Sequence, residues 1–334
     1  MVDFGNIPLM ELNDFLAEWH NDNPRILVHT SGSTGKPKPL MVEKRRMLNS
    51  ARITCDFLGL KPGDTALLCM PLDYIAGKMM VVRSLQRDLR LTSVRPSSHP
   101  LADDALPHFT FAAMVPMQVY NTLKVPCERE RLMHIRHLII GGGAISDELA
   151  QMIKTLPNAV WSTYGMTETL SHIALRRLNG PDASLWYTPF DGVGISLNAD
   201  DCLVIDAPEV CAEPLVTNDI ALLRTDDRTG KTLFRIKGRK DNVVCSGGIK
   251  IQIEEVEETL RPHLSAPFMI VKKQDEMLGE KAILLTESAD LTHIEEICRN
   301  TLPKYWVPRE FLHIDHLPLT ETGKPKRTLP FTPR

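Results

Sequence analysis

The sequence lacks the features that mark membrane, secreted and zinc-binding proteins. No apolar run approaches the roughly 20 residues that a membrane-spanning helix needs. The first residues have no basic segment followed by an apolar core, so we expect no signal peptide. The seven cysteines are dispersed, without a C-x-x-C pair or a metal-like spacing. We therefore expect reduced thiols and a cytoplasmic location.

The sequence also has no large excess of either charge. Its net charge is −3, so no global basic field favours a nucleic acid. Hydrophobic residues make up 43% of the chain and charged residues 24%, which is usual for a globular protein. We expect neither a nucleic acid nor a membrane as a partner.

The order of apolar and polar segments predicts two domains of unequal size in the 334 residues. In the first part, apolar runs such as 25–30 and 65–70 alternate with helix-like segments, which predicts an α/β domain with a largely parallel sheet flanked by helices. Residues from about 186 to 237 have the pattern of a β-rich subdomain. A boundary near 239–241 precedes a compact α+β module of roughly 90 residues.

The stretch "TSGSTGKPK" combines glycines, hydroxyl side chains and lysines. Backbone N–H groups that converge in such a loop bind anions, and hydroxyls and lysines add donors and charge. The stretch is not a Walker A loop, because Pro37 follows Lys36. From composition alone, a flexible exposed turn is an equal alternative. The candidate phosphate-binding residues are Thr30, Ser31, Gly32, Ser33, Thr34, Gly35, Lys36 and Lys38.

Three further segments have both a functional and a structural interpretation. "YGMTET" ends a predicted strand, where α/β sheets bind ligands, and its Glu168 is suited to a divalent cation. "IIGGGAIS" offers a flat backbone surface to a ligand, or forms a strand-to-helix turn capped by Ser146. Asp219 in "TNDIALL" suits a ribose diol, although a turn aspartate is the commoner case.

Taken in order with "GRKD" and "TGKPKR", these segments resemble the adenylate-forming superfamily of acyl- and aryl-CoA ligases, peptide-synthetase adenylation domains and luciferases. The resemblance extends from about residue 26 to 327. It implies a large domain over 1–238, a hinge at 239–241 and a small mobile domain over 242–334. It also implies ATP, Mg²⁺, coenzyme A and a small carboxylic acid as ligands, with a homo-oligomer as an option.

The resemblance implies a role for each residue that would touch the nucleotide. Tyr164 would stack near adenine, Thr167 would touch the α-phosphate and Glu168 would bind Mg²⁺. Asp219 and Arg239 would hold the ribose hydroxyls. The other nucleotide-binding candidates, besides the phosphate loop, are Gly142, Gly143, Ala144, Gly165 and Met166.

The remaining candidates belong to the acyl pocket, the thiol channel and the moving domain. Asp241 would lie at the hinge, and Lys324 would be brought to the α-phosphate by the small domain. The acyl-pocket candidates are Tyr74, Gly77, Lys78, Gly141, Thr169, Ser171 and His172. The candidates for the CoA channel are Ser246, Gly247, Gly248 and Lys250.

The implied reaction has two halves. A substrate carboxylate, which is already ionised at pH 7 and needs no general base, attacks the α-phosphorus of ATP and pyrophosphate leaves. Mg²⁺ and Lys324 would stabilise the charge that develops on the phosphoryl oxygens. Rotation of the small domain would then open a channel for a thiol such as CoA.

Within the superfamily, "GGGAIS" and "YGMTETLSHIAL" most resemble the ligases that form o-succinylbenzoyl-CoA in menaquinone biosynthesis. That acid carries a second, aryl carboxylate, and a buried anion needs a partner. Lys78, His172 and Arg176 are candidates for this partner, and Tyr74 occupies the position of a gating residue in relatives.

The sequence departs from the family pattern in three places. Pro39 replaces the glycine that usually ends the phosphate loop, and proline has no N–H and fixes φ. Only 29 residues precede the loop, so we expect an N-terminal subdomain to be largely missing. Asn218 replaces a usual glycine before Asp219, and asparagine tolerates a positive φ.

Two alternatives to an o-succinylbenzoate ligase remain open. One is a CoA ligase for another aryl or acyl acid, such as a benzoate or a cinnamate. The other is a relative that binds nucleotide or acyl ligand without turnover.

Overall fold

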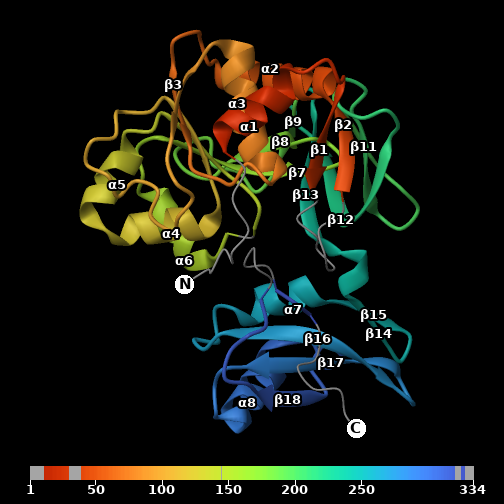
Figure 1. The fold of residues 1–334 in the computed structure, drawn as a ribbon. Helices are drawn as coiled ribbons and strands as arrows, with labels where there is room; N and C mark the ends of the chain where they lie inside the picture. Colours follow the sequence, from red (N-terminus) through yellow and green to blue (C-terminus); the bar gives the residue numbers. More distant parts are fainter. Residues whose placement is uncertain (1–10, 30–38, 144, 320–324, 328–334) are drawn as a thin grey trace. The chain divides into compact units, whose positions relative to one another are not determined.

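The computed structural model describes residues 11–29, 39–143, 145–319 and 325–327. The chain forms two compact units (Figure 1). The large unit comprises Met1–Ile195, Ile205–Leu215 and Arg224–Phe234, and the small unit comprises Ser196–Val204, Val216–Leu223 and Arg235–Arg334. The domain boundary at 239–241 and its role as a hinge stay predictions.

A seven-stranded sheet organises the large unit, with the strand order β4-β3-β5-β6-β7-β8-β9. The strands from β4 to β7 pair in parallel, and β8 and β9 are added antiparallel. The strands are β3 (Thr65–Leu68), β4 (Arg90–Ser93), β5 (Phe111–Met114), β6 (His137–Ile140), β7 (Ala159–Gly165), β8 (His172–Arg177) and β9 (Thr188–Pro189). All residues of β5 are buried, as in strands covered on both faces. The predicted largely parallel sheet is confirmed.

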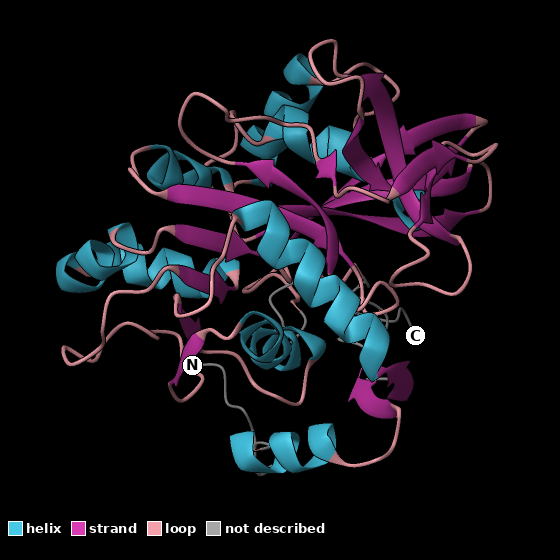
Figure 2. Cartoon of the chain, turned by 90° about the horizontal axis from the view of Figure 1, so that it is seen from above, coloured by secondary structure: helices cyan, strands magenta, loops and turns pink. Residues whose placement is uncertain are grey.

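Helices lie on either side of this sheet (Figure 2). They are α1 (Leu12–His20), α2 (Lys44–Leu58), α3 (Ile75–Arg87), α4 (Pro116–Lys124), α5 (Pro126–Met133) and α6 (Asp147–Lys154). Phe15 and Trp19 of α1 are buried. In α3, every residue from 77 to 84 is buried, so this helix has no solvent-facing side along these two turns.

A β-hairpin flanks the expected phosphate loop. β1 (Arg25–His29) pairs antiparallel with β2 (Pro39–Glu43), and His29 lies opposite Pro39. A proline is tolerated at the first residue of a strand, which accommodates Pro39 in place of the family's glycine. His29 also forms a parallel bridge with Tyr74, so the base of the hairpin lies beside the N-terminus of α3.

The predicted β-rich segment forms a four-stranded sheet with the order β10-β11-β12-β13. These strands are β10 (Gly194–Leu197), β11 (Cys202–Asp206), β12 (Leu215–Thr225) and β13 (Thr232–Arg239).

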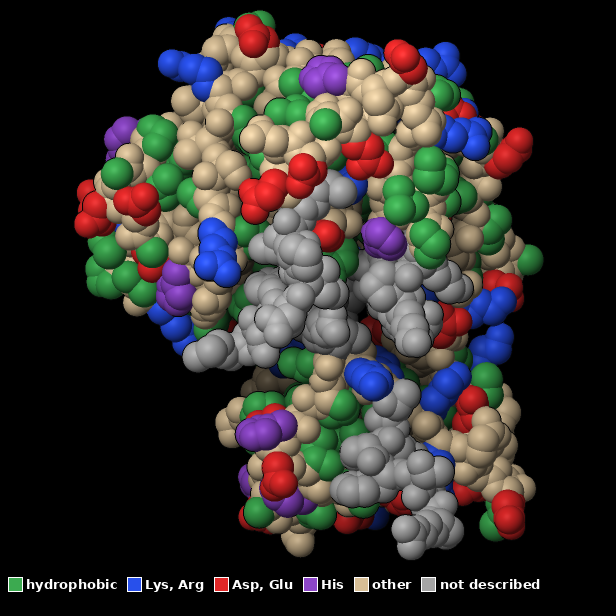
Figure 3. All heavy atoms as spheres, in the orientation of Figure 1, with side chains coloured by type: hydrophobic (Ala, Val, Ile, Leu, Met, Phe, Trp, Pro, Cys, Tyr) green, Lys and Arg blue, Asp and Glu red, His purple; other side chains and the backbone are tan. Residues whose placement is uncertain are grey.

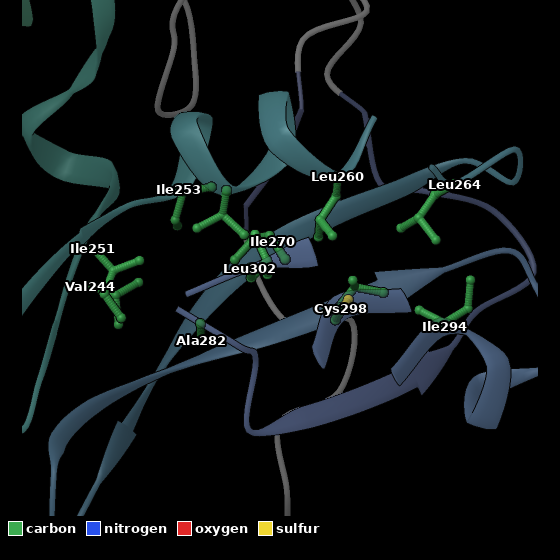
Figure 4. Packing of buried hydrophobic residues seen from close by; sticks show 12 residues of the cluster. Val244, Ile251, Ile253, Leu260, Leu264, Ile270, Ala282, Ile294, Cys298 and Leu302 are labelled. Carbon is green, nitrogen blue, oxygen red and sulfur yellow. The ribbon is translucent and has the colours of Figure 1, made fainter. Parts of the chain in front are cut away.

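The small unit contains a five-stranded sheet in the order β15-β14-β17-β16, with β18 paired parallel to β17. Its elements are the short helix η1 (Lys240–Asn242), β14 (Val243–Ser246), β15 (Ile249–Gln252), α7 (Ile253–Leu260), β16 (Phe268–Asp275), β17 (Gly279–Thr286), α8 (Leu291–Thr301) and β18 (Glu310–His313). Ile253 and Leu260 of α7 pack towards Ile270 of β16 and Leu302 beyond α8 (Figure 4). The predicted α+β module is confirmed.

The surface of the described residues carries both signs of charge. Figure 3 shows Lys and Arg side chains interspersed with Asp and Glu on one face. No helix among the described residues has the length and apolar character needed to cross a membrane.

Candidate active site

The carboxyl ends of parallel strands bring most of the large-unit candidates to one edge of the sheet. Gly141 follows β6, and the "YGMTET" segment begins in β7, which pairs with β6 in parallel. Tyr74 lies on the connection between β3 and α3. Because ligands of α/β proteins bind beyond the carboxyl ends of the strands, this edge is the candidate active site.

The three glycines after β6 form a tight connection to α6. A Cβ on Gly141 would lie 2.4 Å from the Thr163 Oγ1 atom, so any other residue here would require the Thr163 side chain to shift. Gly142 has a positive φ of 81°, and Gly143 lies beside Pro116. The Ser146 hydroxyl accepts a hydrogen bond of 3.2 Å from the Leu149 N–H, so the predicted helix cap is confirmed. The adenine-side role of Gly142 and Gly143 stays a prediction.

The segment after β7 folds back on itself before β8 begins. A Cβ on Gly165 would lie 2.2 Å from the Ser171 carbonyl oxygen, which explains the glycine at this position. The Thr169 hydroxyl accepts a 2.9 Å hydrogen bond from the Met166 N–H and lies 2.6 Å from the same Ser171 oxygen. Leu170 adopts a positive φ of 64°. The side chain of Thr169 therefore holds the turn together, and it is 1% exposed.

Thr167 and Glu168 occupy the tip of this turn. Thr167 is buried, whereas Glu168 is exposed. The Cys211 thiol lies 3.4 Å from the Glu168 carbonyl oxygen and fixes the backbone there. The exposed Glu168 is thus accessible to a ligand, and the predicted roles of Thr167 and Glu168 stay predictions.

Tyr164 lies in an aromatic cluster with Tyr187 and Phe234. Its ring packs edge-on to Phe234 at 5.0 Å between centroids, and Tyr187 stacks on Phe234 at 5.3 Å. The Tyr187 hydroxyl is 2.9 Å from the Ser162 hydroxyl. The Arg176 guanidinium lies over the Tyr187 ring, 5.2 Å from its centroid. This cluster fixes the ring plane that the resemblance places near adenine.

A buried chain of polar side chains connects α3, β8 and α2. An Arg83 amino group donates a 2.6 Å hydrogen bond to the Ser171 hydroxyl. That hydroxyl lies 3.1 Å from His172 Nδ1, and His172 Nε2 lies 3.1 Å from the Thr54 hydroxyl. Thr54 in turn donates to the Ser50 carbonyl oxygen at 3.0 Å.

The two ionisable side chains in this hydrogen-bonded series, His172 and Arg83, differ in charge. Burial, together with the positive charge of Arg83, holds the pKa of His172 well below its usual value, so the imidazole is neutral at pH 7. Burial lowers the pKa of Arg83 to about 10, so the guanidinium still carries its charge. Arg83 is 2% exposed, and no carboxylate among the described residues lies within 4 Å of it. Its Nε atom is a buried donor without a hydrogen-bond partner in the described part of the chain.

Lys78 has contacts that belong to the fold. Its ammonium group donates a 3.0 Å hydrogen bond to the Leu27 carbonyl oxygen of β1 and lies 3.9 Å from Glu18. Burial lowers its pKa. Gly77 lies against the chain at Pro71, because a Cβ would be 2.2 Å from the Pro71 carbonyl oxygen. The predicted pocket roles of Tyr74, Gly77 and Lys78 stay predictions beside these contacts.

The small unit brings the predicted ribose and hinge residues together. Arg239 donates to Asp219 at 3.1 Å and to Asp241 at 2.9 Å. The Asn218 amide also contacts both oxygens of Asp241, at 3.4 and 3.3 Å. Asn218 is not among the residues with positive φ, so its backbone does not use the freedom that the sequence comparison with glycine suggested.

Of the four CoA-channel candidates, Gly247 and Gly248 form the two-residue turn between β14 and β15, while Ser246 and Lys250 lie in these strands. Ser246 and Ile249 are paired across β14 and β15, and Gly247 and Gly248 between them have positive φ values of 57° and 82°. Two positive φ values in a two-residue hairpin loop explain the paired glycines. A Cβ on Gly248 would meet no atom within 4 Å, and Lys250 is exposed.

Some candidates lie outside the described residues. These are Thr30, Ser31, Gly32, Ser33, Thr34, Gly35, Lys36, Lys38, Ala144 and Lys324. Their roles stay predictions.

Arg83 is the residue that the sequence interpretation missed. It lies in the stretch "KMMVVRSL", where a charged residue directly follows four apolar residues, and this was the signal in the sequence. The structure shows that residues 77–84 are buried on all sides of the helix, an environment where arginine is rare. Ser171, the partner of Arg83, is 88 residues away in the chain, so the contact itself has no local signature.

Comparisons with known proteins give one consistent result. A family model described as AMP-binding enzyme matches residues 9–214. The chain is 25% identical to a 2-succinylbenzoate--CoA ligase of Bacillus mycoides (strain KBAB4) over 339 residues, covering 92% of this chain and 69% of that protein. It is 28% identical to a 2-succinylbenzoate--CoA ligase of Salmonella typhimurium, covering 89% and 66%. The chain thus spans about two thirds of the length of these relatives.

Solved structures extend the comparison. An acyl-CoA synthetase (AMP-forming)/AMP-acid ligase II-like protein from Dyadobacter fermentans is 33% identical, with a TM-score of 0.65, and the match covers 94% of this chain and 91% of that one. An o-succinylbenzoate coenzyme A synthetase from Bacillus subtilis, in complex with ATP and magnesium ion, is 23% identical and has the same fold, with a TM-score of 0.70 and coverages of 90% and 68%.

Proposed function

Because the chain belongs to the AMP-binding enzyme family, we propose that it converts o-succinylbenzoate, CoA and ATP into o-succinylbenzoyl-CoA, AMP and pyrophosphate through an acyl-adenylate. The family membership confirms the predicted resemblance to adenylate-forming enzymes and the enzyme class, an AMP-forming acid–CoA ligase. The identity of the acid is the part that the proposal adds.

One observation carries the choice of acid. Arg83 is a buried cation whose charge is not balanced by a carboxylate among the described residues. A buried charge without a counterion is strongly unfavourable, which indicates that the site is completed by an anionic group of a ligand. An acid with a second carboxylate supplies that anion, whereas a simple benzoate has only the carboxylate that reacts.

The neighbours of Arg83 fit this role. The Ser171 hydroxyl accepts a hydrogen bond from Arg83. Because the Thr54 hydroxyl donates to the Ser50 carbonyl oxygen, the single N–H of neutral His172 lies at Nε2, and Nδ1 accepts from the Ser171 hydroxyl. The Nε–H of Arg83, which has no partner among the described residues, is left for an anion. Thr54 holds the other imidazole nitrogen, so the ring cannot rotate without losing a buried hydrogen bond. This chain of contacts fixes the guanidinium beside the turn that carries Thr167 and Glu168.

The described residues also fit a magnesium ion. Among them, no group of three or more His, Cys, Asp or Glu side chains could hold a metal, and Glu168 offers one exposed carboxylate. Mg²⁺ is typically held by one or two carboxylates together with the phosphates of a substrate, which is the donor set available here. Bound in this way, the ion neutralises charge on the phosphates of ATP.

In the proposed reaction, the residues of the chain bind and orient the two reactants. Arg83 holds the aryl carboxylate, which directs the succinyl carboxylate towards the α-phosphorus. Asp219 and Arg239 hold the ribose, and Lys324 stabilises the negative charge on the α-phosphate. The acyl group then passes to the thiol of CoA, and AMP leaves.

A panel of acids tests the proposal. Pyrophosphate release and thioester formation are measured with o-succinylbenzoate, benzoate, a cinnamate and a simple aliphatic acid, each with and without CoA. We expect turnover with o-succinylbenzoate at a kcat/KM at least about 100-fold above that of benzoate, because a charged partner is left unpaired with the smaller acid. Preferred turnover of a monocarboxylic acid would establish the alternative of a different aryl or acyl acid.

The non-catalytic alternative predicts a different result in the same assay. A binding protein would retain ATP in equilibrium dialysis but release no pyrophosphate with any acid.

A further inference from the structure

Gln118 of α4 carries a buried amide whose hydrogen bonds join three connections between strands. The residue is 4% exposed. Its Oε1 atom accepts a 3.1 Å hydrogen bond from the N–H of Val115, which directly follows β5. Its Nε2 atom donates to the Cys69 carbonyl oxygen after β3 at 3.1 Å and to the Ser97 carbonyl oxygen after β4 at 2.9 Å. One side chain therefore links the connections that follow β3, β4 and β5.

These contacts fit the amide of a glutamine and no other side chain of this length. Two carbonyl oxygens need N–H donors and a backbone N–H needs an acceptor, so the partners also determine which end of the amide is oxygen. A carboxylate would place an oxygen against the carbonyl oxygens of Cys69 and Ser97. An apolar side chain would deprive the buried Cys69 carbonyl oxygen of this donor. The Cys69 thiol also donates to the Ala113 carbonyl oxygen of β5 at 3.5 Å, so both the backbone and the side chain of Cys69 are held there.

The three connections lie at the edge of the sheet that forms the candidate active site. β4, β3 and β5 are parallel neighbours, so their carboxyl ends share this edge. The connection after β3 leads to Tyr74, a predicted acyl-pocket residue. On the other side, Val115 lies beside Gly142, a predicted adenine-side residue, because a Cβ on this glycine would be 3.5 Å from the Val115 Cγ1 atom. Gln118 therefore joins the part of the edge predicted to hold the acid to the part predicted to hold adenine.

We propose that Gln118 is a positioning residue, whose amide holds the segment 69–74 at a fixed distance from Gly142 and so aligns the acid with the α-phosphorus of ATP. Because Gln118 is buried, it acts through the backbone segments that it holds and not by contact with a reactant. The inference rests on the proposed function, because it assigns the alignment of the two reactants in that reaction.

Kinetics of the adenylation step test the inference with the full chain. Isotope exchange between pyrophosphate and ATP is measured in the presence of o-succinylbenzoate. We expect Gln118→Met to lower the kcat of this exchange by about 10- to 100-fold, because a small shift of a bound reactant costs that much in rate. The KM values for the acid and for ATP should stay within about threefold, since neither reactant loses a direct contact. A preserved kcat in Gln118→Met would overturn the inference.

A second variant separates the amide from the volume of the side chain. Gln118→Asn keeps the amide but is one methylene shorter, so it cannot reach all three partners and should show the same loss of kcat. Full activity of Gln118→Asn would contradict the inference.

Asn179 provides the matched control, because its buried amide makes the same kinds of contact near the amino end of β7. It is 1% exposed, donates to the Leu156 and Asn158 carbonyl oxygens at 2.8 Å and accepts from the Val160 N–H at 3.1 Å. Asn179→Leu should lower the urea midpoint of unfolding, as Gln118→Met does, and leave kcat unchanged. Equal losses of kcat in the two variants would overturn the inference, since they would indicate a general loss of folded protein.

Hydrogen exchange supplies a measurement that does not depend on turnover. The amides of residues 69–74 and of Val115 should exchange at least about tenfold faster in Gln118→Met than in Asn179→Leu. Equal exchange in the two variants would overturn the inference. If the unchanged protein adenylates no acid, the proposed function fails, while this exchange still reports whether Gln118 fixes the segment.

Discussion

An Arg83 amino group donates a 2.6 Å hydrogen bond to the Ser171 hydroxyl in the large unit, where Arg83 is buried and Ser171 is half-buried. The contact joins the buried part of α3, residues 77–84, to the turn that follows β7. Removing the positive charge of Arg83 distinguishes a binding role from a stabilising role. If Arg83 binds substrate, its loss lowers kcat/KM and does not lower the free energy of unfolding. If Arg83 stabilises the fold, its loss lowers the free energy of unfolding and leaves kcat/KM unchanged.

Replacing Arg83 with methionine should weaken substrate use and leave the fold at least as stable. We expect kcat/KM for o-succinylbenzoate to fall by about 100-fold, because the second carboxylate loses its charged partner. The free energy of unfolding should rise by about 1 kcal/mol, since a buried charge gives way to an apolar side chain. Steady-state kinetics and urea denaturation measure the two effects.

Arg87→Met is the control for this prediction. Arg87 lies at the end of the same helix and forms an ion pair with Asp56. Its replacement should leave kcat/KM unchanged. A fall in unfolding free energy of Arg83→Met, with kcat/KM preserved, would contradict the assigned role.

Neutral His172 predicts that the protein loses stability in mild acid. Burial and Arg83 hold the pKa of His172 well below 6.5 in the folded state, while the unfolded chain takes up the proton near 6.5. As the pH falls below 6.5, the unfolded state binds more protons, so the free energy of unfolding decreases. The contribution of neutral His172 to the free energy of unfolding is fully present above pH 6.5.

The variant His172→Gln removes this titration. Between pH 6.5 and 5, its unfolding free energy should decrease less steeply than that of the unchanged protein, by at most about 1.4 kcal/mol per pH unit. Urea denaturation at several pH values measures the slopes. His20→Gln, at an exposed histidine, should leave the slope unchanged. Identical slopes for the His172 variant and the unchanged protein would show that His172 does not titrate as described.

The turn between β14 and β15 offers a test of the thiol channel. Gly248 has a φ of 82° and no neighbour within 4 Å of an added Cβ, and Gly230 has a φ of 68° and equally open surroundings. Alanine at either position should lower the unfolding free energy by about 1 kcal/mol, because L residues are strained at positive φ. Only Gly248→Ala should also slow thiol transfer from a supplied acyl-adenylate. Equal rates for both variants would remove Gly248 from the channel.

Lys324→Ala should separate the two half-reactions. We expect adenylation to fall by about 100-fold or more, since a preorganised cation no longer stabilises the α-phosphate. Thiol transfer from a supplied acyl-adenylate should remain. Pyrophosphate release and thioester formation measure the two steps, and a parallel loss of both would refute the assignment.

The sequence predicts the framework of the site better than its interior. The parallel sheet follows from local alternation of apolar runs and helices, and the cap at Ser146 follows from its place before α6. The sequence singled out Gly141 and Gly165 as site candidates. The structural reason for glycine at these positions is the close approach of a neighbouring segment, which becomes visible only once β7 is paired with its neighbours.

Contacts between distant side chains account for what could not be predicted. The hydrogen bonds of His172 to Thr54 and of Arg83 to Ser171 join residues 118 and 88 positions apart. Lys78, a predicted acyl-pocket residue, donates a hydrogen bond to the backbone of β1 that the sequence does not indicate, and its pocket role stays a prediction. Such pairings depend on which faces of α2, α3 and β8 meet, and a single sequence does not specify that.

Pro39, the first residue of β2, has a consequence for the free-energy cost of binding ATP. A fixed φ removes backbone freedom at the exit of the segment 30–38, and the strand pairing of His29 with Pro39 holds both ends of that segment together. For the phosphate-binding role proposed for residues 30–38, the backbone at residue 39 therefore has fewer conformations to lose on binding than it would with a glycine. Pro39→Gly should accordingly bind ATP more weakly with a less favourable binding entropy, a difference that titration calorimetry resolves.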